Sequence, residues 1–371
     1  MKKFEHGGNI YDMPRDVLDF SANINPLGLS EKVRSEIESQ IDNLIHYPDP
    51  QMKQLKESIS NRYNLPIEKI SCYNGATEFF YTFFNTIRPA RILIPVPSFS
   101  EYERAGQFST IEYFYLKPAN SFKIPAQLLK TKLNQLEKAT LIFANPNNPT
   151  GNLLEPDELA KILEASKSKA EWIIIDESFL DFVRDSEKYT ARNFLNEYDN
   201  LIVVTSLTKF FAMPGLRIGF AASNEKLREQ LENSKDVWNV NSLAQRAAVV
   251  ALNDENYRLE SLNLIEDEKE FVEMRLKTVA GIERVFKPSA NFILFRLEKS
   301  ASTLLENLRS KNILLRNCEN FEGLDEKYVR MAIRTHDENL RVLEAIENFL
   351  EDEDIESVEN FWNDKFKEQI R

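Results

Sequence analysis

Six apolar runs of five residues recur along the middle of this 371-residue chain, separated by longer segments. Short apolar runs are typical of buried strands, and segments of helical period between them are typical of crossover helices. The alternation predicts an α/β fold in which a mainly parallel sheet lies between helices. The expected strands are 91–95, 112–116, 140–144, 172–176, 201–205 and 217–221.

Three segments carry signals for helices. Ser30 is a suitable N-cap for a helix whose apolar residues recur at positions 33, 37, 41 and 44. A second apolar face has Met52, Leu55, Ile59 and Tyr63. Pro156 suits the first turn of a third helix, because its fixed φ and missing N–H are tolerated there.

The length of the chain predicts two domains, since single cores stop growing at roughly 250 to 300 residues. After about residue 255 a long charged helical stretch is followed by two isolated strand candidates, 291–297 and 329–334. We expect residues 1–30 to form an N-terminal arm and the start of a small α+β domain. Residues 31–260 would then form a large domain, and residues 261–371 the rest of the small domain.

Composition excludes several classes of protein. The net charge of −12 and the dispersed lysines argue against nucleic acid as the main partner. Cys72 and Cys318 stand far apart and outside any CxxC pattern, so we expect neither a disulfide framework nor a metal site. No apolar segment suggests secretion or membrane insertion, and we expect a cytoplasmic protein.

A lysine and an aspartate in the large domain point to pyridoxal 5′-phosphate (PLP) chemistry. Lys209 supplies an amine for a Schiff base with the aldehyde of PLP, and Asp176, at the end of an expected strand, supplies a carboxylate for its ring nitrogen. Ser206, Thr208 and Arg217 supply hydroxyls and a guanidinium for its phosphate. A polar loop and an ordinary helix cap are the simpler alternatives.

Two further segments strengthen the PLP hypothesis. Gly75, Ala76 and Thr77 stand at an expected helix start, where free backbone N–H groups bind phosphate, although a plain helix cap has the same composition. The segment NPNNPTG, residues 145–151, has the composition of a rigid turn. Its Asn148 offers an amide to the phenolic oxygen of PLP.

Taken together, these motifs resemble the fold-type I PLP enzymes of the aspartate aminotransferase superfamily over nearly the whole chain. The resemblance implies that Lys209 is the Schiff-base lysine, Asp176 the partner of the ring nitrogen and Asn148 the ligand of the ring hydroxyl. Phe99 would stack on the ring, although a phenylalanine is more often a core residue. The implied phosphate ligands are Ala76, Thr77, Ser206, Thr208 and Arg217.

Within that superfamily, the segments HGGNIYD (6–12), DFSANINPLG (19–28), YPDP (47–50) and 314–335 resemble the threonine-phosphate decarboxylases of cobalamin biosynthesis, relatives of the histidinol-phosphate aminotransferases. The resemblance implies a homodimer that decarboxylates O-phospho-L-threonine to CO2 and aminopropanol phosphate, a precursor of the cobalamin side chain. It also implies a substrate site lined by His6, Gly7, Asn23, Asn148, Arg316 and Arg330 or Arg334.

Two observations bear on the choice of reaction. Forked guanidinium groups suit a substrate with a carboxylate and a phosphate, although surface arginines in an acidic protein have a simpler explanation. Phe179 stands where many aminotransferases of the superfamily have a tyrosine, which favours decarboxylation. The alternatives are a histidinol-phosphate aminotransferase or related aminotransferase, and a cofactor-binding protein that has lost catalysis.

Overall fold

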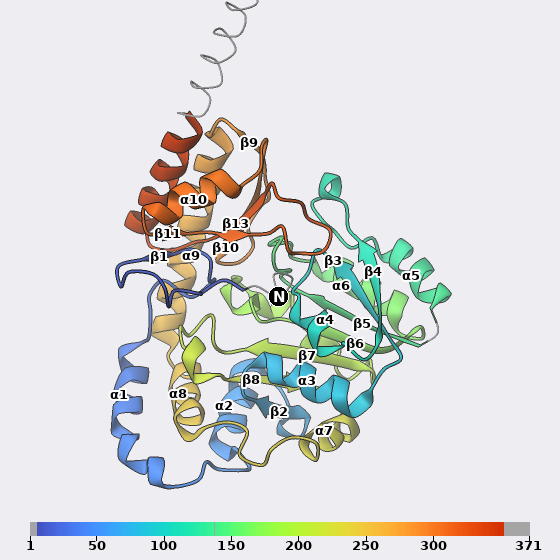
Figure 1. Ribbon diagram of the computed structural model, residues 1–371. Helices are drawn as coiled ribbons and strands as arrows, with labels where there is room; N and C mark the ends of the chain where they lie inside the picture. Colours follow the sequence, from blue (N-terminus) through green and yellow to red (C-terminus); the bar gives the residue numbers. More distant parts are fainter. Residues whose placement is uncertain (1–5, 137, 352–371) are drawn as a thin grey trace, which may run out of the picture.

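The computed structural model describes residues 6–136 and 138–351, and its central feature is a seven-stranded sheet (Figure 1). The strand order is β2-β8-β7-β6-β5-β3-β4, and only β8 runs antiparallel to its neighbours. The strands are β2 (Ile70–Tyr73), β3 (Arg91–Val96), β4 (Thr110–Tyr115), β5 (Ala139–Ala144), β6 (Ala170–Asp176), β7 (Leu201–Ser206) and β8 (Gly219–Ala222). The predicted mainly parallel sheet is confirmed.

Helices cover both faces of this sheet, because successive side chains of its strands point to opposite sides and both sides are apolar. Leu141 and Phe143 of β5 join one buried cluster, while Ile142 between them joins another. The helices are α1 (Glu31–Ser39), α2 (Lys53–Tyr63), α3 (Ala76–Ile87), α4 (Glu101–Ala105), α5 (Ala126–Gln135), α6 (Pro156–Ser166), α7 (Glu225–Glu232), α8 (Ser242–Leu252), α9 (Glu255–Thr278) and α10 (Ser302–Ser310). Residues 336–351 are also helical.

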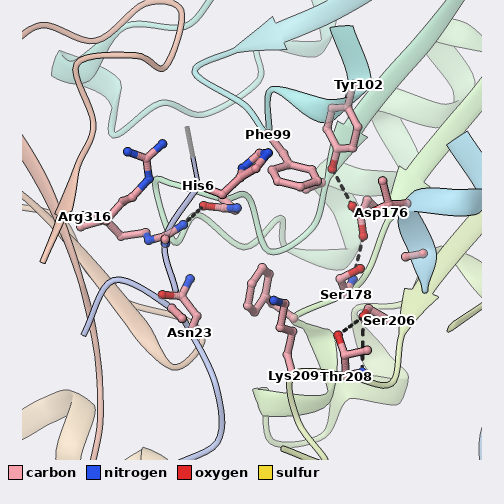
Figure 2. A pocket seen from close by; sticks show the side chains of 18 of the residues that line it. His6, Asn23, Phe99, Tyr102, Asp176, Ser178, Ser206, Thr208, Lys209 and Arg316 are labelled. Atoms are coloured by element: carbon pink, nitrogen blue, oxygen red, sulfur yellow. Dashed lines mark hydrogen bonds between the residues drawn. The ribbon is translucent and has the colours of Figure 1, made fainter. Parts of the chain in front are cut away.

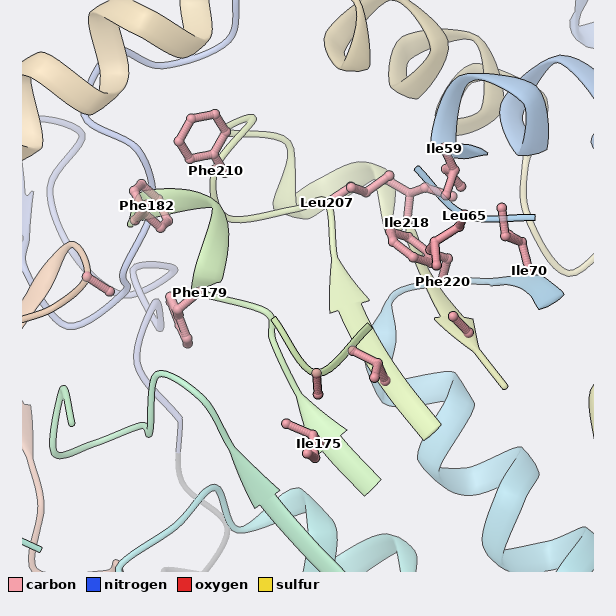
Figure 3. Packing of buried hydrophobic residues seen from close by; sticks show 14 of the residues in the cluster. Ile59, Leu65, Ile70, Ile175, Phe179, Phe182, Leu207, Phe210, Ile218 and Phe220 are labelled. Atoms are coloured by element: carbon pink, nitrogen blue, oxygen red, sulfur yellow. The ribbon is translucent and has the colours of Figure 1, made fainter. Parts of the chain in front are cut away.

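The larger of these two clusters, which includes Leu141 and Phe143, holds in place the strand ends that carry the polar site residues. Figure 3 shows Ile175 of β6, Leu207 after β7 and Phe220 of β8 within this cluster, together with Phe179. Phe179 packs edge-on against Phe292, with ring centroids 4.9 Å apart. The loops that follow β6 and β7 are therefore anchored by buried apolar side chains.

A second, antiparallel sheet lies over the carboxyl ends of the large sheet (Figure 1). Its order is β12 (Arg316–Asn317), β13 (Tyr328–Ala332), β10 (Phe292–Leu297) and β9 (Ile282–Val285). The N-terminal segment joins it through β1 (Leu18–Asp19), which pairs in parallel with β11 (Ile313–Leu314). The division at residues 30 and 260 stays a prediction: α9 runs across residue 260, and residues 1–5 and 352–371 lie outside the described chain.

The predicted helices differ from the structure in one respect. Ser30 caps α1 by accepting a hydrogen bond from Val33 N at 3.3 Å, as expected. The α-helix ends at Ser39, however, and Ile41 and Leu44 lie in a 3₁₀ helix with about half of their surface exposed. The apolar spacing therefore continues beyond the helix into a surface segment. Among the described residues, no helix is long and apolar enough to cross a membrane.

Candidate active site

A cavity of about 190 Å³ lies at the carboxyl ends of the parallel strands, between the large sheet, the antiparallel sheet and the N-terminal segment (Figure 2). Ligand sites of α/β folds occur at this edge of the sheet. Most of the predicted site residues line it: His6, Gly7, Asn23, Ala76, Thr77, Phe99, Asn148, Asp176, Ser206, Thr208, Lys209, Arg217, Arg316 and Arg330. Residues up to 324 positions apart in the sequence thus meet in one cavity.

Lys209 follows β7 and extends into this cavity (Figure 2). Burial lowers the pKa of its amine most, the charges of Arg217 and Arg330 also lower it, Asp176 raises it, and together these effects bring the pKa to about 8. A substantial fraction of the amine is therefore neutral near pH 8, which is the form that attacks a carbonyl. The N-terminal segment fixes the loop, since Asn25 N donates to Lys209 O at 3.1 Å.

Asp176 is the last residue of β6 and is buried, with 6% of its surface exposed. Burial raises the pKa of this carboxyl group, and hydrogen bonds from Ser178 and Tyr102 oppose the increase. Ser178 N donates to Oδ1 at 2.9 Å, and Tyr102 Oη donates to Oδ2 at 2.7 Å (Figure 2). The carboxylate is thus held on both of its oxygens.

The start of α3 and the residues after β7 form an anion-binding cradle. Gly75 caps α3 with a φ of 80°, and a Cβ at this position would lie only 2.3 Å from Arg217 Nη2. Glycine is therefore required if the guanidinium is to approach the helix N-terminus. Ser206 Oγ and Thr208 Oγ1 lie 2.7 Å apart, so both hydroxyls face the same small volume.

Asn148 lies in the turn after β5, and side-chain hydrogen bonds stabilise this turn. Asn147 Nδ2 donates to Pro97 O at 3.0 Å and to Thr150 Oγ1 at 2.9 Å. Asn148 Oδ1 accepts a hydrogen bond from Arg330 Nη1 at 2.5 Å. The asparagine therefore connects the turn of the large sheet with the antiparallel sheet.

Two arginines face each other in the antiparallel sheet. Arg316 of β12 and Arg330 of β13 are directly opposite in the register, so their side chains leave the same face. They are 7% and 6% exposed. Burial, together with the charge of Arg316, lowers the pKa of Arg330 to about 10, although Cys318 raises it. Arg330 donates to the neutral acceptors Asn148 Oδ1 and Ser21 O, and its buried Nε has no partner among the described residues.

The N-terminal segment supplies the remaining wall of the cavity. His6 Nε2 lies 2.8 Å from Oε1 of Glu101, a buried residue of α4, and its ring centroid is 5.7 Å from that of Phe99. Burial alone would raise the pKa of Glu101, but its contacts with His6, Arg104 and Tyr81 outweigh this and lower it. His6 is therefore held beside the ring of Phe99 by an ionised side chain.

The structure places two of the predicted residues outside the lining. Gly75 lies behind it and acts on its shape through Arg217. Arg334 is directed elsewhere: its Nη2 donates to Glu338 Oε1 at 2.7 Å and its Nη1 to Asp19 O at 3.3 Å. The sequence left open whether Arg330 or Arg334 lines the substrate site. The structure brings Arg330 into the cavity and directs Arg334 away from it.

Several lining residues carry no signal in the sequence. Tyr102 follows Phe99 by three residues, about one helical turn, but nothing in the sequence indicates that it reaches Asp176 across 74 positions. Ser178 contributes through its backbone N–H, which any residue type other than proline would provide. Phe321 also joins the wall and lies under the guanidinium of Arg316, 5.2 Å from the ring centroid.

With this fold and site, the chain belongs to the aminotransferase class I and II family, whose model matches residues 15–346. It is 35% identical over 354 residues to a protein of Caldanaerobacter subterraneus subsp. tengcongensis provisionally named a threonine-phosphate decarboxylase, and the match covers 95% of each chain. It is 33% identical over 355 residues to the threonine-phosphate decarboxylase of Salmonella typhimurium, covering 93% of this chain and 96% of that protein.

One solved structure is similarly close. The histidinol-phosphate aminotransferase from Clostridium acetobutylicum superposes with a TM-score of 0.84 and 34% sequence identity, covering 91% of this chain and 100% of that one. The likeness confirms the predicted fold class and the predicted resemblance to this superfamily. Membership of the family also implies dependence on PLP.

Proposed function

We propose that this protein is a PLP-dependent decarboxylase of O-phospho-L-threonine that releases aminopropanol phosphate and CO2. The observation that carries the proposal is the pair of buried arginines, Arg316 and Arg330, facing one cavity with Lys209. Guanidinium groups recognise carboxylates and phosphates through paired hydrogen bonds. A substrate with a carboxylate and a phosphate provides two such anions, and the similar decarboxylases support this substrate.

The residues of the cavity fit PLP by their chemistry. The cradle made by the α3 N-terminus, Ser206, Thr208 and Arg217 offers backbone N–H groups, hydroxyls and a guanidinium to a phosphate. Asp176 offers a carboxylate to a ring nitrogen, and Lys209 an amine to an aldehyde. Asn148 would hold the ring hydroxyl, and Phe99 would cover the ring.

When bound, PLP withdraws electrons from the substrate Cα, most strongly from the bond held perpendicular to its ring. Residues of the chain determine which bond at Cα is held in that orientation. Arg330, fixed by Asn148 and Ser21, would bind the carboxylate, and Arg316 with His6 would bind the phosphate. Two fixed anchors on one substrate set the rotation about Cα, so the carboxylate can be held in the reactive position.

Lys209 has two tasks in this reaction. Its amine would hold PLP while no substrate is bound, and once free it would hold a proton close to Cα. Lys209 lines the cavity and would supply to Cα the one proton that replaces the carboxylate lost as CO2. The apolar rings of Phe99, Phe179 and Phe321 limit the access of water.

The proposal is tested by supplying the PLP-loaded protein with O-phospho-L-threonine and quantifying CO2 and aminopropanol phosphate. Equal amounts of the two products are expected. The same assay with O-phospho-L-serine measures the contribution of one methyl group, which is worth roughly 1 to 3 kcal/mol in an apolar pocket. No turnover of either phosphoamino acid would contradict the proposal.

Histidinol-phosphate aminotransferase is the second candidate, and the similarity to the Clostridium acetobutylicum structure favours it. Histidinol phosphate carries a phosphate but no carboxylate, so it offers an anion to only one of the two buried arginines. A loss of histidinol phosphate that requires 2-oxoglutarate would establish this activity. A catalytically inactive PLP-binding protein would instead bind both ligands without forming a product.

We infer that the protein is a homodimer. Support comes from an exposed apolar segment after α1 and a neighbouring loop, in which Tyr47 and Trp238 stack with ring centroids 4.4 Å apart. Large exposed apolar patches are typical of interaction surfaces. The exposed apolar patch of this protein has residues that are 44% to 83% exposed, namely Ile41, Leu44, Ile45, Tyr47, Val237 and Trp238. Light scattering should give a dimer for the native chain and a monomer for Ile45→Asp, whereas Leu128→Asp on α5 should leave the dimer intact.

A further inference from the structure

The hydroxyl of Tyr102 is aimed at the carboxylate expected to face the ring nitrogen of PLP (Figure 2). The distance from its Oη to Asp176 Oδ2 is 2.7 Å, and both side chains are buried. A second donor to the carboxylate is the backbone N–H of Ser178, at 2.9 Å from Oδ1. Each oxygen of Asp176 therefore accepts a hydrogen bond from the chain.

Packing leaves Tyr102 little freedom to point elsewhere. Its ring contacts Phe80 and Phe99 edge-on, with centroids 5.0 Å and 5.6 Å away. Its surface is fully buried. A buried tyrosine needs a partner for its hydroxyl, and a backbone carbonyl would satisfy that need equally well. Here the partner is a carboxylate whose affinity for protons matters to the cofactor.

Donors to an ionised carboxylate lower its affinity for protons, whereas burial raises it. Both effects act on Asp176, where burial is the larger and raises the pKa of the group. A pyridine nitrogen beside this carboxylate shares one proton with it. The more donors the carboxylate accepts from the chain, the more that proton stays on the nitrogen, which is the form that withdraws electrons.

We propose that Tyr102 is a positioning residue that orients Asp176 and keeps the shared proton on the ring nitrogen of PLP. This rests on the proposed cofactor site but not on the identity of the substrate. Without the hydroxyl, the proton moves from the nitrogen toward the carboxylate, and the ring becomes a weaker electron acceptor. No other atom or electron is transferred.

The test uses holoenzyme loaded with PLP that carries ¹⁵N in its ring, because the ¹⁵N chemical shift separates protonated from neutral pyridine. For Tyr102→Phe the signal should move toward the neutral form. The value of kcat should fall roughly tenfold with KM nearly unchanged, as expected for the loss of one hydrogen bond to a charged group. The matched control is Tyr63→Phe, which removes a hydroxyl that donates to Asp181 at 2.8 Å, outside the cavity lining. It should keep the native signal.

A second variant covers the case in which Tyr102→Phe does not retain the cofactor. Incorporation of 3-fluorotyrosine at position 102 keeps the ring and makes its hydroxyl a stronger donor, so the nitrogen should stay protonated to higher pH. A native ¹⁵N signal and pH profile in the variants that bind PLP would overturn the proposal. Because this signal needs no substrate, a failed assay with O-phospho-L-threonine leaves the result interpretable.

Discussion

The two halves of the cavity are built in different ways. The half expected to bind PLP consists of residues at the ends of parallel strands of one sheet, namely Asp176 at the end of β6, and Ser206, Thr208 and Lys209 at and after the end of β7. The half expected to bind the substrate joins the N-terminal segment to the antiparallel sheet, so that His6 and Arg316 meet from 310 positions apart.

The PLP half therefore determines which class of reaction is possible, and the substrate half determines which bond of the substrate reacts. A single rigid sheet holds the groups that any PLP reaction needs, and buried clusters on both of its faces fix them. The arginines and the N-terminal segment lie on elements that pack against that sheet and decide which bond of the substrate is held in the reactive position. Changes in the first half should therefore affect every reaction, and changes in the second should affect the choice of substrate and product.

The largest effect is expected from Lys209→Ala. Both decarboxylation and any amino transfer should fall by at least about 10³-fold, because the covalent attachment and the positioned proton are lost together. PLP should still bind without a covalent bond, as measured by its absorbance after dialysis. A variant that keeps more than a tenth of the native rate would contradict the role given to Lys209.

Arg330→Lys should act mainly on the substrate half. We expect kcat/KM for O-phospho-L-threonine to fall about 10²-fold, because an ammonium cannot reproduce the hydrogen bonds that the buried guanidinium makes at once. The affinity for PLP should change much less, because the variant reaches the PLP half only through Asn148. Arg334→Lys should lower the melting temperature more than kcat/KM, and Arg341→Lys, at an exposed position, should change neither. Equal losses for positions 330 and 334 would remove the distinction between them.

The pH dependence of cofactor capture sharpens the description of the PLP half. Lys209 reacts as the neutral amine, and its pKa is lowered to about 8. The rate at which the apoprotein attaches PLP should therefore rise about tenfold per pH unit below this value and level off above it. Borohydride trapping followed by mass spectrometry measures the rate. A rise that continues to about pH 10 would indicate an ordinary exposed lysine.

The smallest effect is expected from Glu101→Gln. The variant weakens the contact that holds His6 beside Phe99, so the KM for O-phospho-L-threonine should rise about threefold while kcat is kept. Glu57→Gln, at an exposed position of α2, is the matched control. Steady-state kinetics of the two variants separates them, and a lower kcat with an unchanged KM would place Glu101 outside the substrate half.

The PLP half could be predicted from the sequence because its residues are tied to local signals. Lys209 and Asp176 follow apolar runs that proved to be β7 and β6, and Gly75 and Ala76 stand at a helix start with a glycine that the approach of Arg217 requires. Parallel strands bring such ends to one edge of the sheet. Apolar runs that end in polar residues are therefore enough to place these side chains together.

The substrate half could be predicted only in part. The choice between Arg330 and Arg334 depends on where β13 ends, because Arg330 lies inside the strand opposite Arg316 and Arg334 follows its last residue, Ala332. The contacts of Tyr102 with Asp176 and of His6 with Glu101 join segments far apart in the sequence. Such contacts arise from tertiary packing, which local patterns do not encode.

The central claim is that the substrate half holds the carboxylate, and not the Cα hydrogen, in the reactive position. O-Phospho-L-threonine that carries deuterium on Cα tests this directly, with the mass of the product as the readout. The account predicts aminopropanol phosphate that retains the deuterium and has gained one hydrogen from water. Release of the deuterium into water, together with a keto acid, would contradict it.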